Sequence, residues 1–164
     1  MYCGFGLSVT IILPGVIVRE LRRRVEASGM SLEEFIAEIA TEDIDPSERA
    51  GRYVKAALEL LDQVRVELDR GNLRQASEKI WGACALAVKA YAYARDGRRI
   101  TSHGELWRYS EVLAGDLGDW VAASWAHANS MHTNFYEGWA TRWHVEKALR
   151  AVEKLVKAVV EKVG

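Results

Sequence analysis

The sequence predicts a mainly α-helical protein, in which an antiparallel up-and-down helical bundle follows an N-terminal strand-helix-helix arm. Apolar residues recur every three to four positions along most of the chain, which is the period of an amphipathic helix. Paired capping residues, such as Ser31 with Glu34 and Ser102 with Glu105, mark helix starts. Only the segment from Leu7 to Leu13 shows the alternating pattern of a strand with one buried face.

The predicted arm covers residues 1–45. Its strand ends at Pro14, and a helix follows from Val16 to the neighbourhood of Gly29, a residue suited to a helix C-terminus. The second helix starts at the Ser31 capping box. The residues of this helix that we expect to point inward are Leu32, Phe35, Ile36 and Ile39.

The predicted bundle covers residues 46–164 and contains about five helices. Asp45 and Pro46 form its first start signal, and the very short connection at Gly71 makes the first two helices antiparallel neighbours. The expected inward residues of the first helix are Tyr53, Ala57, Leu60, Leu61, Val64 and Leu68, and those of the last are Val145, Leu149, Val152, Val156 and Val159.

The amino-acid composition limits the classes of function that we expect for this protein. The formal net charge of -1 argues against a globally basic nucleic-acid binder, although a local patch is compatible with it. Cys3 and Cys84 lie far apart and predict a reduced, cytoplasmic protein without a disulfide framework. The apolar run from Val9 to Val18 is interrupted by Pro14 and Gly15, so we expect no membrane span and no membrane partner.

The candidate site is the stretch from Trp125 to Trp139. Its residues Trp125, Asn129, His132, Tyr136 and Trp139 follow at steps of four, three, four and three, so a helix places them on one face. One interpretation is packing around a hydrogen-bonded histidine. The other is a small site in which His132 moves a proton or binds phosphate while Asn129 and Tyr136 donate hydrogen bonds. His127 and Asn134, in the same stretch, are further candidate binding residues.

Metal and cofactor chemistry are not expected. His127 and His132 are five positions apart, which turns them about 140° from each other on a helix and prevents them from sharing one ion. Cys84 lies in a helix interior without a neighbouring base that would activate it.

A basic turn at residues 95–101 offers a second group of candidates. Arg98, Arg99 and His103 are either a solvated turn that favours the C-terminus of the preceding helix, or a local patch that attracts phosphate.

The N-terminal segment resembles a known family of DNA-binding proteins. The segment SVTIILP, an amphipathic helix and SGMSLEEFI are similar over residues 7–42 to the ribbon-helix-helix family, whose paired strands enter the DNA major groove. The base-reading positions of that family fall on Ser8, Thr10 and Ile12, none of which is basic. We therefore expect a dimerisation arm, with DNA binding the weaker alternative.

A second resemblance covers residues 48–162 and adds an expected partner. The motifs LRQASEKIWGACALAVKAYA, SHGELW and HANSMHTNFYEGW resemble the archaeal PaREP family, whose bundle belongs to the HEPN superfamily. The resemblance implies a HEPN-like bundle that pairs into a homodimer. Some HEPN proteins also partner a nucleotidyltransferase, which is a further expected class of partner.

HEPN ribonucleases, including those of toxin-antitoxin systems, carry an arginine and a catalytic histidine that are separated by four to six intervening residues. His132 matches that histidine, but the position of the arginine holds His127. The leading hypothesis is therefore a homodimeric binding module for RNA or a nucleotide. The alternatives are a metal-independent ribonuclease that takes its cation from Arg98, Arg99 or the partner chain, and a DNA-binding regulator.

Overall fold

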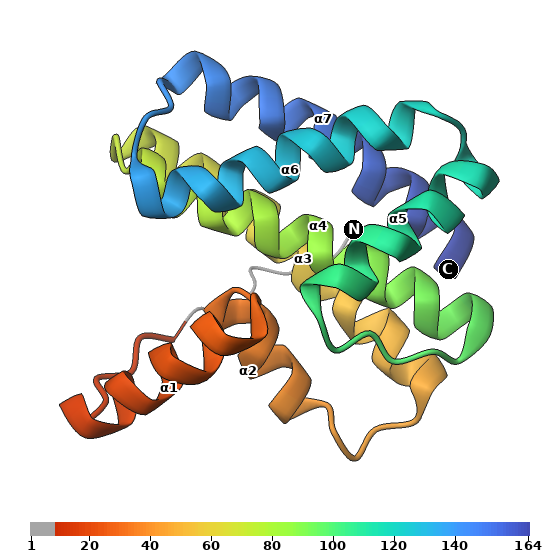
Figure 1. The fold of residues 1–164 in the computed structure, drawn as a ribbon, viewed down its shortest axis with the longest axis horizontal. Coiled ribbons are helices and arrows are strands. Elements are labelled where there is room, and N and C mark those ends of the chain that lie inside the picture. The colour runs from red at the N-terminus through yellow and green to blue at the C-terminus, as the bar shows by residue number, and fades with distance from the viewer. Residues whose placement is uncertain (1–8) are drawn as a thin grey trace, which may run out of the picture.

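A computed structural model describes residues 9–164, and in that range the chain forms seven α-helices (Figure 1). The helices are α1 (Gly15–Ser28), α2 (Leu32–Ala40), α3 (Pro46–Asp69), α4 (Leu73–Asp96), α5 (His103–Leu117), α6 (Trp120–Glu137) and α7 (Arg142–Val163). Helices α3 to α7 form the bundle, while α1 projects away from it and α2 lies against it (Figure 1). None of these helices is both long enough and apolar enough to cross a membrane.

Helix α4 is the centre of the bundle. It packs against α2, α3, α5, α6 and α7, and every residue from Ile80 to Tyr93 is buried. Its many alanines allow neighbouring helices to approach closely. At Gly82 a Cβ atom would lie 3.2 Å from Cδ1 of Leu60 and 3.3 Å from Oγ of Ser31, so this glycine lets both α3 and the start of α2 reach α4.

The predicted helical bundle is confirmed, as are the apolar stripes of its first and last helices. All six expected inward residues of α3 and all five of α7 are buried. Asp45 caps α3 by accepting a hydrogen bond from the Ser47 amide, with Pro46 at the first helical position. Local start signals and helical periodicity therefore predict these elements well.

The predicted strand at residues 7–13 is wrong for its described part. Residues 9–14 have no regular secondary structure, and Val9, Ile11 and Ile12 are exposed. A single strand leaves its backbone amides and carbonyls unpaired, and residues 9–164 contain no second strand to pair with it. Residues 7 and 8 lie outside the described range.

The inward face of α2 also differs from the prediction. Leu32, Ile36 and Ile39 are exposed, and the carboxylates of Glu34 and Glu38 are buried instead. The reason lies in the opposing helix, because α4 presents a lysine to this face of α2 and thereby selects the charged residues as the buried side.

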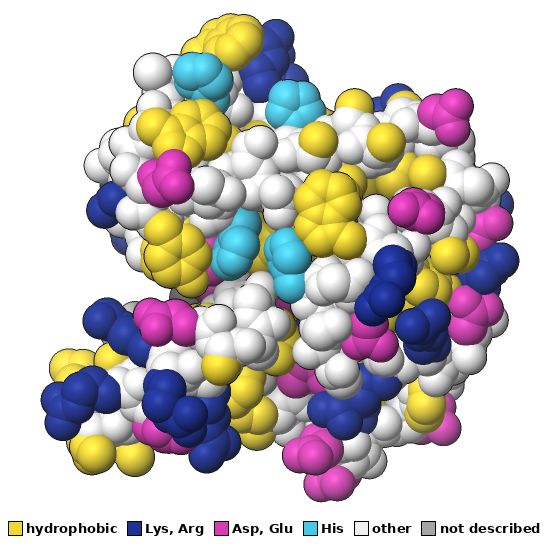
Figure 2. Space-filling view, in the orientation of Figure 1, with side chains coloured by type: hydrophobic (Ala, Val, Ile, Leu, Met, Phe, Trp, Pro, Cys, Tyr) yellow, Lys and Arg dark blue, Asp and Glu magenta, His cyan; other side chains and the backbone are white. Residues whose placement is uncertain are grey.

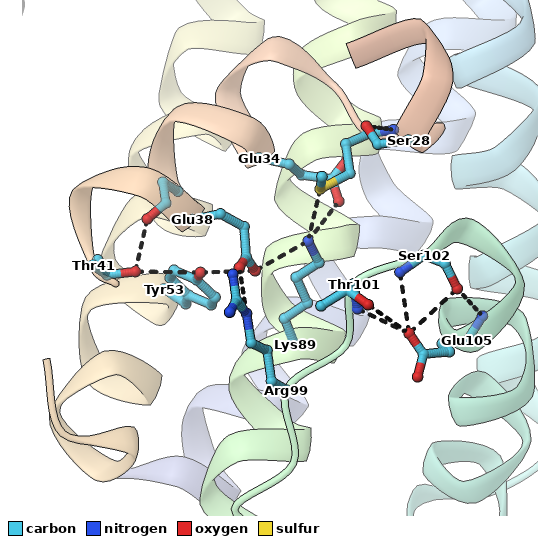
Figure 3. Close-up of polar contacts among 12 residues, drawn as sticks. Ser28, Glu34, Glu38, Thr41, Tyr53, Lys89, Arg99, Thr101, Ser102 and Glu105 are labelled. Carbon is cyan, nitrogen blue, oxygen red and sulfur yellow. Dashed lines mark hydrogen bonds and ion pairs between the residues drawn. The ribbon is translucent and has the colours of Figure 1, made fainter. Parts of the chain in front are cut away.

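That lysine, Lys89, holds α2 to the bundle through a buried ionic cluster (Figure 3). Its Nζ lies 3.4 Å from Oε1 of Glu34 and 3.3 Å from Oε1 of Glu38. The hydroxyl of Tyr53 donates to Glu38 at 3.0 Å, and Nε of Arg99 lies 3.2 Å from its other oxygen. The second oxygen of Glu34 accepts the Ser31 amide at 2.8 Å and completes the capping box.

We predict that Lys89→Met destabilises the fold strongly. The substitution leaves Glu34 without a cation and Glu38 with Arg99 alone. Breaking a buried ion pair in this way costs about 3–5 kcal/mol of unfolding free energy. Urea denaturation measures the loss. The matched control Lys147→Met changes an exposed lysine and should leave the midpoint nearly unchanged. A Lys89→Met protein as stable as the parent would contradict the role of this cluster.

Candidate histidine-carboxylate site

Three side chains from three helices meet at the candidate site: Glu78 of α4, His103 of α5 and His132 of α6. Nδ1 of His132 lies 3.2 Å from Oε2 of Glu78. The two imidazole rings are stacked, with ring centroids 6.0 Å apart and planes at 28°. Glu78 is buried, whereas both histidines are partly exposed. The carboxylate of this group is therefore shielded from solvent, whereas the two imidazole rings are partly accessible to it.

Aromatic side chains form the floor of this group. The Trp81 ring lies 4.9 Å from the His132 ring and 5.2 Å from the His103 ring, measured between centroids. Tyr136, one helical turn after His132, lies edge-on to it at 5.5 Å. Trp125 is fully buried behind Trp81, with ring centroids 5.3 Å apart. This packing fixes the imidazole rings in place.

Two local structures position His103 at the start of α5. The Ser102 and Glu105 capping box fixes the first turn of the helix. The turn between α1 and α2 lies against the ring, because a Cβ on Gly29 would be 3.1 Å from Cβ of His103. Gly29 has φ of 67°, a left-handed conformation that disfavours other residues. The arm and the bundle therefore meet at this histidine.

Burial and neighbouring charge perturb the site. Burial lowers the pKa of His103, and the charge of His132 lowers it further, while the charge of Glu34 and hydrogen bonding of the ring to Asn129 and to the Gly29 backbone act in the opposite direction. Burial raises the pKa of Glu78, partly offset by its hydrogen bond to His132. Burial also raises the pKa of the Tyr136 hydroxyl. Perturbed groups of this kind gather at functional sites more often than elsewhere.

The hydrogen bonds assign a role to each ring nitrogen. The Trp107 indole N–H donates to Nε2 of His103 at 3.0 Å, so the neutral His103 ring carries its proton on Nδ1. With Glu78 ionised, His132 donates from Nδ1, and its Nε2 is left to accept a hydrogen bond or, on protonation, to donate one. The carboxylate therefore orients His132 and selects its tautomer.

A hollow of about 620 Å³ lies beside this group, between the N-terminal helices and the bundle. Its lining residues come from α1, α2, the start of α4 and the end of α6: Arg22, Val25, Glu26, Leu32, Glu33, Asn72, Arg74, Gln75, Glu78, Phe135 and Tyr136. Figure 2 shows two histidines side by side next to a recess that separates the projecting helix from the main body. Glu78 and Tyr136 belong both to the hollow and to the surroundings of His132.

The structure brings together part of the predicted ridge. Asn129, His132 and Tyr136 lie on the open side of α6, whereas Trp139 lies beyond the last residue of that helix, Glu137. His127 is exposed. Asn134 is fully buried, where its amide donates to Ser77 Oγ at 2.8 Å and accepts the Ala140 amide at 2.6 Å, so it ties α6 to α4 and to the turn before α7.

The predicted arginines point elsewhere. Arg98 pairs with Glu105 at 3.5 Å, and Arg99 pairs with Glu38 at 3.2 Å as part of the Lys89 cluster. His103, from the same predicted group, does reach His132. Within residues 9–164 no three histidine, cysteine or acidic side chains are grouped as metal ligands.

Sequence reasoning missed four residues of this region: Glu78, Trp81, Arg22 and Arg74. A signal existed for the first of them. Helix α4 has apolar residues on all sides, so a carboxylate within it needs a partner to offset its desolvation. Nothing in the sequence indicated that Arg22 of the arm and Arg74 of the bundle line one hollow.

These features define an all-helical bundle protein with a histidine-carboxylate group beside a polar hollow. Residues 52–162 match the model of the archaeal PaREP1/PaREP8 family. The match spans more than half of the chain, and the protein belongs to this family. Searches of curated proteins and of solved structures gave no match.

We predict that His103 makes the unfolding free energy depend on pH. Its folded-state pKa lies below the ordinary value of 6.5, so its contribution is fully present above pH 6.5 and is lost as pH falls through the folded-state pKa. Denaturation between about pH 7.5 and 4.5, compared with His103→Gln, isolates this dependence from that of the carboxylates.

The control His127→Gln removes an exposed histidine and should keep the parental pH profile. If His103→Gln follows the same profile as the parent, the desolvation of His103 is refuted.

Proposed function

We propose that this protein is a HEPN-like, homodimeric binding protein for RNA or nucleotides, and that the ligand occupies the hollow beside Glu78 and His132. The antiparallel bundle and the placement of His132 on α6, against Trp81 of the central helix α4, support the HEPN resemblance. The observation that carries the ligand class is the composition of the hollow, which joins two arginines and a helix N-terminus to an exposed aromatic ring.

The phosphate end of such a ligand has suitable partners. Arg22 and Arg74 line the hollow, and the N-terminus of α4 at Asn72 opens into it. Guanidinium groups bind phosphate through charge-assisted hydrogen bonds, and the positive end of the α4 dipole favours a negative group at the same place. Arg74 is already held in place, because it donates to the Tyr136 carbonyl at 2.7 Å. Binding would therefore cost little additional order in that side chain.

The base end has partners as well. Tyr136 is 49% exposed and can stack on a base, as aromatic side chains do in single-stranded nucleic-acid sites. Gln75 and Glu26 offer hydrogen-bonding groups to a base edge. Two of the three acids in the hollow already have partners, since Glu33 pairs with Lys79 at 3.5 Å and Glu78 contacts His132. The negative charge of Glu33 is therefore partly neutralised before a phosphate arrives.

Cleavage of RNA is not part of this proposal. A metal-independent ribonuclease needs a fixed cation beside its histidine to stabilise the phosphorane charge. The described neighbours of His132 are Glu78 and the rings of Trp81, His103 and Tyr136, and none of them is a lysine or arginine. The DNA-binding alternative is disfavoured because none of its base-reading positions, Ser8, Thr10 and Ile12, is basic.

We predict that the protein binds ADP more tightly than adenosine, since only ADP uses the arginines. Removal of one charge-assisted contact in Arg22→Ala should weaken ADP binding by about tenfold and leave adenosine nearly unaffected. Tyr136→Ala should weaken both ligands. Isothermal titration calorimetry on the full chain gives the affinities. Arg52→Ala, an exposed arginine of α3, is the control. Equal losses of ADP affinity in Arg22→Ala and Arg52→Ala would refute the proposed site, and so would the absence of ADP binding by the parent protein.

The homodimer belongs to the same proposal and is supported by the apolar surface of the arm. Val9, Ile11, Ile12, Val16 and Ile17 are all exposed, and Ile12 is 95% accessible. Residues 9–13 also make no backbone hydrogen bond within the described chain. A second copy can cover these side chains and pair this backbone, which is the low-energy arrangement for an unpaired extended segment.

We predict that the protein is a dimer that Ile12→Glu and Val16→Glu convert to a monomer, because each places a charge in the apolar contact. Light scattering coupled to size exclusion measures the mass. Val66→Glu changes an exposed valine of α3 and should leave the dimer intact. A parent protein that is monomeric at all concentrations would rule the dimer out.

A further inference from the structure

A second surface next to the hollow is rich in exposed aromatic rings. Of these rings, only Tyr136 belongs to the proposed site. We name it the α6–α7 aromatic face, and it consists of Tyr136, Trp139, Trp143 and His144. Trp139 is 47% exposed and Trp143 is 61% exposed. Figure 2 shows histidines and large apolar side chains gathered along this side of the molecule, next to the recess. Neighbouring exposed tryptophans are rare on a surface without a partner.

The rings of this face are held in position before any ligand arrives. His144 lies edge-on to both tryptophans, with ring centroids 5.9 Å from Trp139 and 5.1 Å from Trp143. Nδ1 of His144 accepts the Thr141 amide at 3.2 Å and contacts the Thr141 hydroxyl at 2.8 Å, so the ring also caps α7. Ordered aromatic rings lose little conformational entropy on binding.

Two cations lie beside the rings. Nζ of Lys147 lies 5.5 Å from the Trp143 ring centroid. Arg142, at the first position of α7, pairs with Glu146 at 2.8 Å and donates to the Leu68 carbonyl at 2.9 Å, and its side chain is partly exposed. The first turn of α7 contains no acidic residue, so no carboxylate there offsets the positive end of the helix dipole. Arg74 supplies a third cation at the Tyr136 end. Rings interleaved with cations suit a chain of bases joined by phosphates, whereas the core of a protein interface is depleted of lysine and glutamate.

The face also adjoins the hollow through Arg74. Arg74 lines the hollow, donates to the Tyr136 carbonyl and lies against Gly138, the residue before Trp139. A ligand with one nucleotide in the hollow can therefore extend its next nucleotides along these rings.

We infer that the α6–α7 aromatic face is a binding track for single-stranded RNA, in which unpaired bases stack on Trp139 and Trp143 while Arg142 and Lys147 contact the phosphates. This inference deepens the proposed function, because it makes the ligand an RNA strand instead of a free nucleotide. Stacking on this track needs unpaired bases, so it selects single strands over duplexes.

The test compares ligands of different length on the full chain. Fluorescence anisotropy follows a labelled single-stranded RNA of about eight nucleotides, a length within the range of known single-strand sites, and calorimetry follows ADP. The parent should bind the strand more tightly than ADP and more tightly than a duplex of the same sequence. Trp139→Ala and Trp143→Ala should each weaken strand binding by about tenfold and leave ADP binding unchanged. Trp143→Phe should retain most of the affinity, and Val66→Ala should retain all of it.

The remaining outcomes separate this inference from the proposed function. The track is refuted, and the proposed site in the hollow still stands, if ADP binds but the strand binds no more tightly. The same conclusion follows if both tryptophan variants keep the parental affinity for the strand. Strand binding that needs the tryptophans, without any ADP binding, supports the track and refutes the hollow. If Trp143→Ala turns a dimer into a monomer and strand affinity is unchanged, the face belongs to a second copy and the track is refuted.

Discussion

The buried contact of Lys89 with Glu34 and Glu38 determines how the N-terminal helices sit on the bundle. A lysine in the middle of a buried helix is tolerable only if its charge is matched, and α2 supplies the match from two successive turns. Because both carboxylates must reach one ammonium group, the rotation of α2 about its own axis is fixed. Apolar packing alone would allow several rotations of similar energy.

This single contact has consequences at some distance. With α2 fixed, its first turn packs against Gly82 of α4. The turn between α1 and α2, at Gly29, then lies against His103. The same rotation directs Ile36 and Ile39 outward. The charged face of α2 thus organises the interior and the candidate site, while its apolar face is free to meet another molecule.

The sequence predicted those parts of the fold that depend on local physics. Helix starts were visible because capping is a short-range interaction, as at Ser31 and Ser102. The stripes of α3 and α7 were visible because each of these helices has one solvated side. The burial of Glu38 in place of Ile39 was not predictable, because its cause is a lysine 51 residues away.

The same distinction between local and long-range interactions applies to the candidate site. His132 and Tyr136 lie one helical turn apart, and periodicity placed them together. The contact between His132 and Glu78 joins residues 54 positions apart, and no local pattern reports it. The expected strand failed for the opposite reason. Its alternation is a genuine local pattern, but strand structure needs a second strand, and the described chain does not provide one.

The two walls of the hollow come from different parts of the chain. The family match begins at residue 52, yet Arg22, Glu26, Leu32 and Glu33 contribute one wall of the hollow and precede it. The opposite wall, from Asn72 to Tyr136, lies inside the match. Changes at Arg22, Glu26 or Glu33 can therefore reshape the first of these walls while Glu34 and Glu38, the α2 residues that pair with Lys89 of α4, are kept. Within the N-terminal helices, the residues that line the hollow and those that hold the helices to the bundle are different.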